Sequence, residues 1–402
     1  MARHMAKSGR RRPIASAVLN LFFTLFGWTC AALAIVGGGY CAYAALAVRR
    51  FFADACDTAA EAASPLPPIS ILKPLRGGGD DLTDALETFC VQTNAPELQL
   101  VFGWQDEHDS AAAAVAALRL RRPDMDIACV VDPRVDGENR KISNVVNICA
   151  EAKYDTLVLS DADIAVGPDY LRRVVEPLNR PGVGGVTCLY VGRAIAGGWS
   201  QLAAMAINYQ FMTNVVVGLS LGLATPCFGS TIALSRATLS KIGGFAPFKN
   251  RLADDYEIGR AIRSLGLRIA VPPMTVVHTC AESSLAALID HEIRWARTVR
   301  VLDPAGHAGS VVTHSLPLAL IAGALLGLSP IGVTLIFAVL GVRIAAKFAI
   351  DRATGARAGP WWLLPLRDVL SFGVFVASFL GSTVDWQGRR FRVSRDGVLT
   401  PL

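Results

Sequence analysis

The chain has 402 residues, of which 52% are hydrophobic and only 18% are charged. A soluble domain carries about 25% charged residues, so this composition excludes an ordinary soluble protein. The apolar excess lies in residues 14–48 and 311–383, and the stretch between them has mixed composition and room for one α/β domain. The sequence therefore predicts a membrane protein with a globular domain in its middle.

The charge pattern and the cysteines indicate the surroundings of that domain. The net charge is a modest +6, and basic residues cluster beside the apolar segments, at 10–12, 49–50 and 389–392. This pattern suits anionic lipid headgroups rather than nucleic acid. The nine cysteines include no C-x-x-C pair and several lie in apolar runs, which is typical of reduced core residues. We therefore expect the middle domain to face the cytoplasm.

The first part of the chain divides into three segments. Residues 1–13 form a basic tail, residues 14–48 an N-terminal membrane segment, and residues 49–68 a small acidic and proline-containing linker. The membrane segment is longer than one span needs and contains three glycines at 37–39, so a single tilted helix and a tight hairpin are both open. We prefer the single helix, because each half of a hairpin would be short.

Residues 69–310 alternate between strand-like and helix-like stretches, which predicts a mainly parallel, doubly wound α/β sheet. The expected strands are residues 69–72, 98–104, 127–131, 157–160, 183–191, 232–235 and 276–280. The expected helices begin near 81 and 254 and cover 110–121, 141–152 and 283–301. In such a sheet ligands bind beyond the carboxyl ends of the strands, where Asp106 and Asp161 stand.

Two carboxylates follow the strand at 157–160 directly. Asp161 and Asp163 stand one residue apart in the loop, so both can turn toward one cation. Hard divalent cations take oxygen ligands, and Mg²⁺ is typically held by one or two carboxylates together with substrate phosphates. The sequence thus suggests a metal–diphosphate site, and a solvated Asp-Ala-Asp turn is the alternative.

Several later stretches leave alternatives open. Residues 198–221 fit an interfacial helix or an ordinary core helix equally well. Asp254 and Asp255 open a helix, where carboxylates are also favoured by the helix dipole alone. His278 lies in a short strand, where a lone histidine is more often structural than a metal ligand.

The C-terminal part carries further apolar segments. Residues 311–328 and 331–346 fit a hairpin with both ends in the cytoplasm. The next segment, 361–383, contains Arg367 and Asp368 and is short of uninterrupted apolar residues, which suggests a re-entrant or interfacial helix. Residues 384–402 are expected to be a basic cytoplasmic tail.

Taken in order, these motifs resemble the D, D, D, (Q/R)xxRW signature of inverting glycosyltransferases of families 2 and 21. The resemblance covers about 65–310 and the flanking membrane segments, and within these families it points to the ceramide glucosyltransferase branch, which includes hopanoid-associated bacterial enzymes. It rests on the phrases ISILKPL (69–75), NRKISN (139–144), LSDADI (159–164), VTCLY (186–190), LADDYEIG (252–259) and HEIRW (291–295). Position 291 is His, where the eukaryotic signature has Gln or Arg.

The resemblance implies a GT-A nucleotide-sugar-binding fold and a role for each matching residue. Asp161 and Asp163 would hold Mg²⁺ or Mn²⁺ against the diphosphate of a UDP-sugar, and Asp255 would be the general base. The implied catalytic residues are Asp255, Arg294 and Trp295. The implied nucleotide-sugar-binding residues are Asp106, Lys141, Asn144, Asp161, Asp254 and His291.

The resemblance also implies a reaction and a location. A sugar would pass with inversion from UDP-N-acetylglucosamine or UDP-glucose to a hydroxyl of a lipid in the bacterial inner membrane. The phrases VVDPR (130–134) and VTCLY favour a hopanoid polyol such as bacteriohopanetetrol as the acceptor. Ceramide is the alternative acceptor. A processive polysaccharide synthase-transporter and a catalytically silent scaffold are the remaining alternatives.

Overall fold

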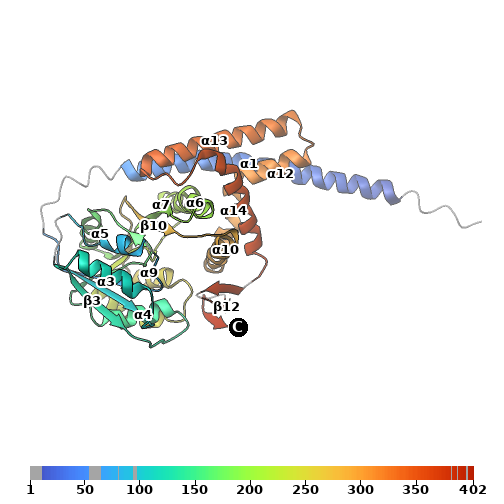
Figure 1. Ribbon diagram of the computed structural model, residues 1–402. Coiled ribbons are helices and arrows are strands. Elements are labelled where there is room, and N and C mark those ends of the chain that lie inside the picture. Colours follow the sequence, from blue (N-terminus) through green and yellow to red (C-terminus); the bar gives the residue numbers. More distant parts are fainter. Residues whose placement is uncertain are drawn as a thin grey trace, which may run out of the picture.

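The computed structural model describes residues 11–53, 65–79, 81–93, 97–381, 383–386, 388–394 and 397–402. It consists of an α/β domain and a group of long helices that runs along one side of it (Figure 1). Most of the predicted basic tail, 1–13, lies outside the described residues, which begin within the first helix.

A mixed seven-stranded sheet forms the centre of the α/β domain, in the order β3-β2-β1-β4-β8-β6-β9. The strands are β1 (Ile69–Pro74), β2 (Leu98–Trp104), β3 (Asp126–Val131), β4 (Thr156–Leu159), β6 (Val183–Val186), β8 (Ile232–Ser235) and β9 (Arg268–Ala270). The first four in this order are mutually parallel, whereas β8 runs antiparallel between β4 and β6. The beginning of β8 therefore meets the carboxyl end of β4, where Asp161 and Asp163 follow.

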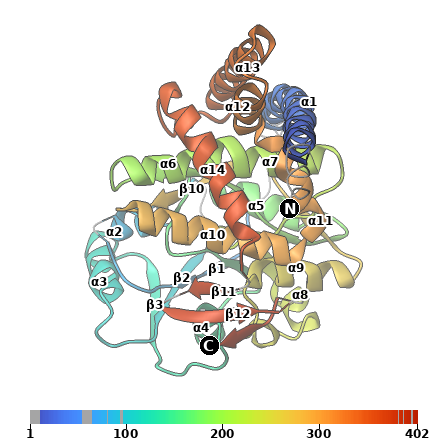
Figure 2. The ribbon, with the colours of Figure 1, turned by 90° about the vertical axis from the view of Figure 1, so that its right-hand side faces the viewer.

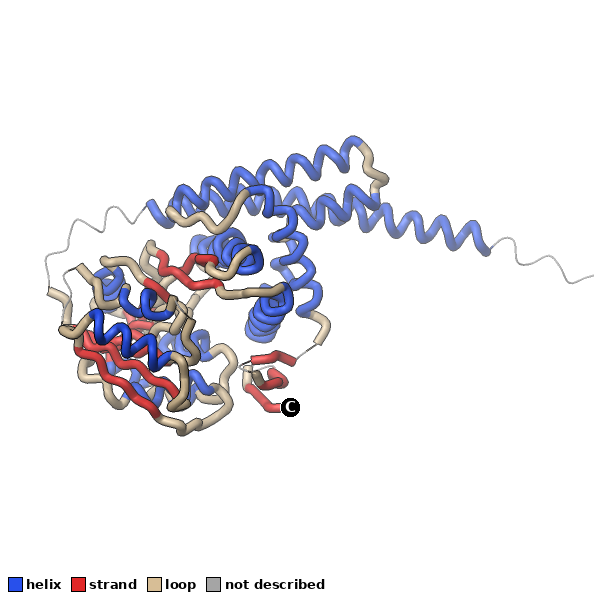
Figure 3. Tube along the Cα trace, viewed as in Figure 1, coloured by secondary structure: helices blue, strands red, loops and turns tan. Residues whose placement is uncertain are grey.

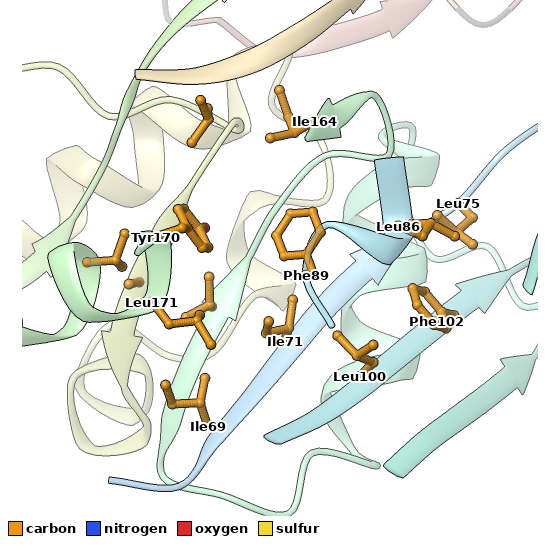
Figure 4. Close-up of a cluster of buried hydrophobic side chains, with 14 of the residues drawn as sticks. Ile69, Ile71, Leu75, Leu86, Phe89, Leu100, Phe102, Ile164, Tyr170 and Leu171 are labelled. Carbon is orange, nitrogen blue, oxygen red and sulfur yellow. The ribbon is translucent and has the colours of Figure 1, made fainter. Parts of the chain in front are cut away.

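Helices cover both faces of the central sheet, because alternate side chains of each buried strand point to opposite faces. Ile71 of β1 packs on the face covered by α2 (Leu82–Glu87), α3 (Ala111–Arg121) and α5 (Tyr170–Leu178), a cluster drawn in Figure 4. Leu72, the next residue, packs on the other face. That face is covered by α4 (Arg140–Cys149), α8 (Arg236–Lys241), η3 (Ala246–Phe248) and α9 (Asp254–Ser264).

A second sheet, in the order β5-β10-β7, consists of β5 (Ile164–Ala165), β7 (Leu189–Ala194) and β10 (Thr275–Cys280). The single strand expected at 183–191 was wrong, because the chain leaves the central sheet between β6 and β7. At this point the Thr187 backbone N–H donates to Ala270 O, and its hydroxyl accepts from the Phe228 N–H. This crossing brings β7 and β10 beside the predicted site.

The helix α1 (Arg11–Ala53) is continuous, so the single-helix alternative holds. It packs against η4 (Ser310–Thr313), α12 (Ser315–Leu325) and α13 (Pro330–Thr354), and α11 (Pro304–Gly309) precedes them. Gly37 makes the close approach possible, because a Cβ there would overlap the Val312 carbonyl oxygen. By length and composition, four of the described helices could cross a membrane, or five if the bent pair of 304–313 and 315–325 is one span.

The segment at 198–220 is one helix with a π-helical turn, made of α6 (Gly198–Ala206), η2 (Ile207–Phe211) and α7 (Met212–Ser220). It packs between α1 and the second sheet in a shared hydrophobic cluster, which supports the core alternative. The helix α14 (Leu364–Ser378), which follows η5 (Trp361–Leu363), turns polar residues inward: Arg367 is 2% exposed, whereas Leu366 is 53% exposed.

The last residues do not form the expected tail of 384–402. They fold into a three-stranded antiparallel sheet of β11 (Thr383–Trp386), β12 (Arg389–Val393) and β13 (Leu399–Pro401). The alternating apolar residues Phe391 and Val393 bury one face of this sheet against Leu252. Figure 3 shows these strands apart from the central sheet, beyond α10 (Leu285–Leu302).

Candidate active site

A cavity of about 560 Å³ lies beyond the carboxyl ends of β1 and β4. Its walls come from the loop before β8, the start of α9 and one face of α10, which Figure 2 shows in front of the central sheet. The cavity brings together every site residue expected from the sequence except Asp106. Those residues are Lys141, Asn144, Asp161, Asp163, Asp254, Asp255, His291, Arg294 and Trp295.

The turn that carries the two aspartates is fixed by hydrogen bonds on both sides. The Ser160 N–H donates to Leu72 O of β1, and the Asp161 N–H donates to Gly229 O in the loop before β8, at 3.1 and 3.0 Å. The side chain of Asp163 is half exposed and lies 3.4 Å from Nδ1 of His278, measured to Oδ2. His278 of β10 thus joins the turn, which the sequence could not establish.

Asp163 is strongly acidic in this setting. Burial by itself would raise its pKa, but the nearby His278 imidazole and the lysines at 73 and 141 outweigh burial and lower the pKa of Asp163 to about 2. Burial lowers the pKa of His278, and the Asp163 carboxylate reverses this effect and raises it. The side chain of Asp163 is therefore an ionised carboxylate at neutral pH.

Lys73 also belongs to the site, although it was not among the site residues expected from the sequence. It is fully buried at the end of β1, and its Nζ donates to Asp161 O at 2.6 Å and to Ile164 O at 3.4 Å. The ammonium also lies 4.1 Å from the centre of the Phe89 ring. Burial lowers the pKa of Lys73 to about 7. The signal was present in the sequence, since a lysine in a buried strand needs polar partners.

Lys141, in the first turn of α4, links the aspartate turn to α9. Its Nζ lies 2.7 Å from Asp161 Oδ1 and 3.1 Å from Asp254 Oδ2. Burial opposes its charge, but Asp161, Asp254 and Asp255 prevail and hold the pKa of Lys141 well above its ordinary value. Asn139 caps α4 and donates to Asp254 Oδ1 at 3.2 Å. Asp254 is thus buried and engaged in holding these elements together.

Asp255, by contrast, faces the cavity. Its Oδ2 accepts a hydrogen bond from the Gly229 N–H at 3.0 Å, and its Oδ1 accepts from the Tyr256 N–H. Burial and the neighbouring Asp254 raise the pKa of Asp255 to about 6. A carboxylate with such a pKa is a suitable general base near neutral pH.

Gly229 is the point where both carboxylate loops meet. Its N–H binds Asp255 and its carbonyl binds Asp161. A Cβ at this position would overlap Asp161 Oδ2 and would lie 2.8 Å from Lys141 Nζ. Only glycine therefore allows this backbone to approach the acidic pair so closely.

One face of α10 closes the cavity. His291, Arg294 and Trp295 follow the i, i+3, i+4 spacing, so they point the same way. Nδ1 of His291 lies 2.7 Å from Oε1 of Glu282, and its ring stacks edge-on against Trp295 with centroids 4.4 Å apart. These contacts fix the histidine as a support for the tryptophan ring.

Arg294 makes no ion pair with any residue in the described part of the chain. Burial lowers its pKa, while Tyr190 and the carboxylates of Asp163, Asp161 and Asp255 oppose this effect. Arginine nevertheless stays charged in proteins. The cavity therefore contains a fixed cation beside its acidic cluster.

The wall that adjoins Trp295 is aromatic. The rings of Tyr190, Phe211 and Phe228 contact each other, with centroids 4.8 to 5.9 Å apart, and the first two also contact Trp295. The cavity thus combines the charged groups of the aspartate turn with an aromatic wall beside them, and His278 contacts both, since it lies 3.4 Å from Asp163 and 5.7 Å from the Tyr190 ring centre.

Two expected binding residues differ from the others. The amide of Asn144 donates to Gly103 O at 2.7 Å and to Leu75 O at 3.5 Å, so it ties the ends of β1 and β2 together. Asp106 is exposed outside the cavity and accepts from the His108 N–H, whereas the preceding residue, Gln105, lines the cavity.

The C-terminal sheet supplies a wall that the sequence analysis did not foresee. Trp386 of β11 lines the cavity. The sheet is held in place by Leu399, whose N–H donates to Asn250 O at 2.9 Å, and by Arg389, which lies 3.0 Å from Glu138. It is therefore attached to the loops that lead to Asp254 and to α4.

The aspartate turn fits a hard divalent cation. Asp163 is ionised and half exposed, and Asp161 uses only Oδ1 for its ion pair with Lys141. Two protein carboxylates with substrate phosphates and water are a usual ligand set for such a cation. Among the described residues no group of three or more His, Cys, Asp or Glu side chains forms a closed metal site.

Comparison with known proteins finds ceramide glucosyltransferases among the relatives of this chain. The chain is 22% identical over 350 residues to ceramide glucosyltransferase 1 of Caenorhabditis elegans, covering 83% of this chain and 73% of the relative. Ceramide glucosyltransferase 3 of the same organism is also 22% identical, over 355 residues, covering 84% and 75%.

Among solved structures, a mannosyltransferase from Pyrobaculum calidifontis in complex with GDP-mannose and Mn²⁺ has a TM-score of 0.50 at 19% identity, covering 86% of this chain and 99% of that one. The α/β domain thus has the GT-A-like fold expected from the sequence. The model of Glycosyl transferase family 21 matches residues 29–399, so the chain belongs to this family.

Proposed function

We propose that this glycosyltransferase transfers a hexose, with inversion, from a UDP-sugar to a hydroxyl of a membrane lipid. The observation that carries the proposal is the Gly229 backbone, which places the base candidate Asp255 directly beside the Asp161 turn. Asp255 would therefore act on the acceptor hydroxyl, while the Asp161 turn would act on the diphosphate of the donor.

In the proposed reaction Asp255 takes the proton of the acceptor hydroxyl as its oxygen bonds to the anomeric carbon. The bond from that carbon to the diphosphate breaks on the opposite face, and the bonding electrons leave with UDP. Arg294 and Lys141 hold positive charge near the departing diphosphate. Mg²⁺ or Mn²⁺, held by Asp161 and Asp163, would neutralise charge on the same leaving group when bound.

The remaining expected residues would complete the donor site. Asp106 would bind the nucleoside, and Asn144 would act indirectly by fixing the ends of β1 and β2. Asp254 would hold Lys141 in place, and His291 would orient Trp295 as a packing wall for the sugar or the acceptor. Supporting this arrangement, the cavity combines charged groups, which suit a nucleotide-sugar, with an aromatic wall, which suits a lipid.

We propose a hopanoid polyol as the preferred acceptor, on the local phrases at 130–134 and 186–190, and the inner bacterial membrane with a cytoplasmic catalytic domain as the location. The names of the curated relatives favour ceramide instead. Ceramide therefore stays the second candidate, and anionic membrane lipids are proposed as further partners.

A transfer assay separates these candidates. Purified protein in lipid nanodiscs receives radiolabelled UDP-N-acetylglucosamine or UDP-glucose with either bacteriohopanetetrol or ceramide, and labelled lipids are separated by chromatography. We expect one labelled glycolipid, whose formation stops with EDTA and resumes with Mg²⁺ or Mn²⁺. Product from ceramide alone would contradict the hopanoid proposal, a polymer would contradict single transfer, and activity that resists EDTA would contradict the metal role.

A further inference from the structure

A second large cavity, of about 850 Å³, shares no residue with the active-site cavity. It lies where the C-terminal end of α1 meets α5, α7 and the loop after β9. In Figure 1 this end of α1 lies above α5, on the side of the molecule opposite α10. We call this second cavity the α1–α5 groove. Nothing in the proposed glycosyl transfer uses it.

The α1–α5 groove contains an excess of positive charge. Its lining includes the basic residues Arg50, Arg172, Arg173, Arg180 and Arg268 and the acidic residues Asp169 and Glu176. Both acids are paired within α5: Arg172 lies 2.9 Å from Glu176, and Arg173 pairs with Asp169. Arg50, Arg180 and Arg268 are exposed and form no ion pair with a residue in the described ranges.

The other side of the groove is apolar and belongs to membrane-type helices. Ala47 and Phe51 of α1 and Val216 and Leu219 of α7 line it. The helix at 16–53 is long and apolar enough to cross a bilayer, with a mean hydropathy of 1.9 over its most apolar 18 residues. A cluster of arginines at the end of such a helix is a typical place for anionic headgroups.

We propose that the α1–α5 groove binds an anionic phospholipid. Its phosphate would lie among Arg50, Arg180 and Arg268, because a guanidinium fork binds two phosphate oxygens at once. The first part of an acyl chain would lie along Phe51 and Leu219. The charge excess and the apolar strip match the two parts of this ligand. The bound lipid would attach the catalytic domain to the membrane, in addition to the attachment by the helices that enter the membrane.

Photolabelling can test the site on the full chain. The protein is placed in phosphatidylcholine nanodiscs that contain a photoactivatable phosphatidylglycerol, and labelled peptides are identified by mass spectrometry. We expect labels in 43–51 and 170–180, and labelling of these peptides should fall when unmodified phosphatidylglycerol is added. Each arginine removed should weaken the apparent affinity about fivefold, so R50Q/R180Q/R268Q should need about 100-fold more photoactivatable phosphatidylglycerol to reach the same labelling.

The matched control removes three exposed basic residues outside the groove, in R119Q/K241Q/R392Q, and should label like the native chain. Thermal unfolding of both variants establishes that they are folded. Unchanged groove labelling in R50Q/R180Q/R268Q would overturn the proposal, as would equal labelling by a photoactivatable phosphatidylcholine. Displacement by inorganic phosphate more strongly than by chloride of equal ionic strength would assign the arginines to a free anion.

The acidic residues of the linker provide one more discriminating variant. Asp54, Asp57 and Glu61 follow α1 in the sequence. If the linker rather than a lipid neutralised the groove, the native chain should show no groove labelling and labelling should appear only in D54N/D57N/E61Q, which would overturn the proposal. Labelling unchanged by these substitutions supports the lipid as the occupant.

Discussion

Arg367 of α14 holds Glu292 of α10 with both ends of its guanidinium, at 2.6 and 2.7 Å from the two carboxylate oxygens. Glu292 stands between His291 and Arg294, whose side chains line the cavity. The pair therefore joins the helix that carries Arg294 to a helix with an apolar outer face. It also explains why a segment that could lie in a membrane contains a buried arginine.

Removing one partner of this pair should destabilise the protein strongly. Arg367→Met leaves the Glu292 carboxylate buried without its cation, which typically costs about 3–5 kcal/mol. We expect a lowered unfolding temperature in detergent and a parallel loss of transfer activity. The double variant R367M/E292M should recover much of the stability, because neither charge remains. Strictly additive losses in the double variant would contradict a direct coupling of the two side chains.

Asp255→Asn should remove the base and keep the donor site. We expect transfer to fall by about 10²–10⁴-fold, with little change in the affinity for UDP. Transfer and UDP binding, measured by calorimetry, separate the two effects. Asp254→Asn is the comparison variant, and it should lower the unfolding temperature because Asp254 is buried against Lys141 and Asn139. Native-like turnover in Asp255→Asn would contradict the assigned role.

The same residue predicts a pH dependence. The pKa of Asp255 is raised to about 6, so its carboxyl is protonated and inactive as a base below that pH. We expect kcat/KM to rise with pH through about 6 and to level off above it. The residual activity of Asp255→Asn should not follow this curve. A native profile that is flat between pH 5 and 7 would show that another group takes the proton.

Lys73→Met should weaken the cation site through the backbone. The substitution leaves the carbonyl oxygens of Asp161 and Ile164 without their buried donor, at about 1–3 kcal/mol for each unsatisfied group. We expect half-maximal activation to require at least about tenfold more Mn²⁺, measured by titrating the metal at a saturating concentration of the sugar donor. The control is Ser70→Ala on the same strand, whose hydroxyl binds Gln99 away from the turn. Equal metal dependence in both variants would leave Lys73 with a structural role only.

Gly229→Ala should abolish transfer. The added Cβ would displace the Asp161 carboxylate and the Lys141 ammonium, so the cation site and the base would move apart. Gly198→Ala is a matched control, because a Cβ there has no neighbour within 4 Å. The measurement is transfer activity together with UDP affinity. Full activity in Gly229→Ala would show that the loop before β8 can shift without consequence for the site.

Trp386→Ala should affect the acceptor more than the donor. Trp386 reaches the cavity from the C-terminal sheet, whose apolar cluster also contacts Val301 of α10. We expect the KM for the lipid acceptor to rise about tenfold while the KM for the UDP-sugar changes little, since burial of a large aromatic ring contributes about 1.5–3 kcal/mol. An equal rise in both constants would indicate general loosening of the cavity.

The sequence by itself determined the strand-to-helix order, the GT-A-like fold class and the family, because these depend on local periodicity and on short motifs. Asp161 and Asp163 could be selected because they follow a buried strand, and Asp255, Arg294 and Trp295 because they match the family signature. The position of the two aspartates beside a cavity follows from the rule that ligands bind beyond the carboxyl ends of parallel strands.

Only the tertiary structure decided which partners these residues have. The antiparallel β8 brings Gly229 between Asp161 and Asp255, and the pairing of β10 with β5 brings His278 to Asp163. The C-terminal sheet and the buried pair of Arg367 and Glu292 join segments that lie far apart in the sequence. No local pattern specifies such contacts, because they arise from the packing of whole elements against one another.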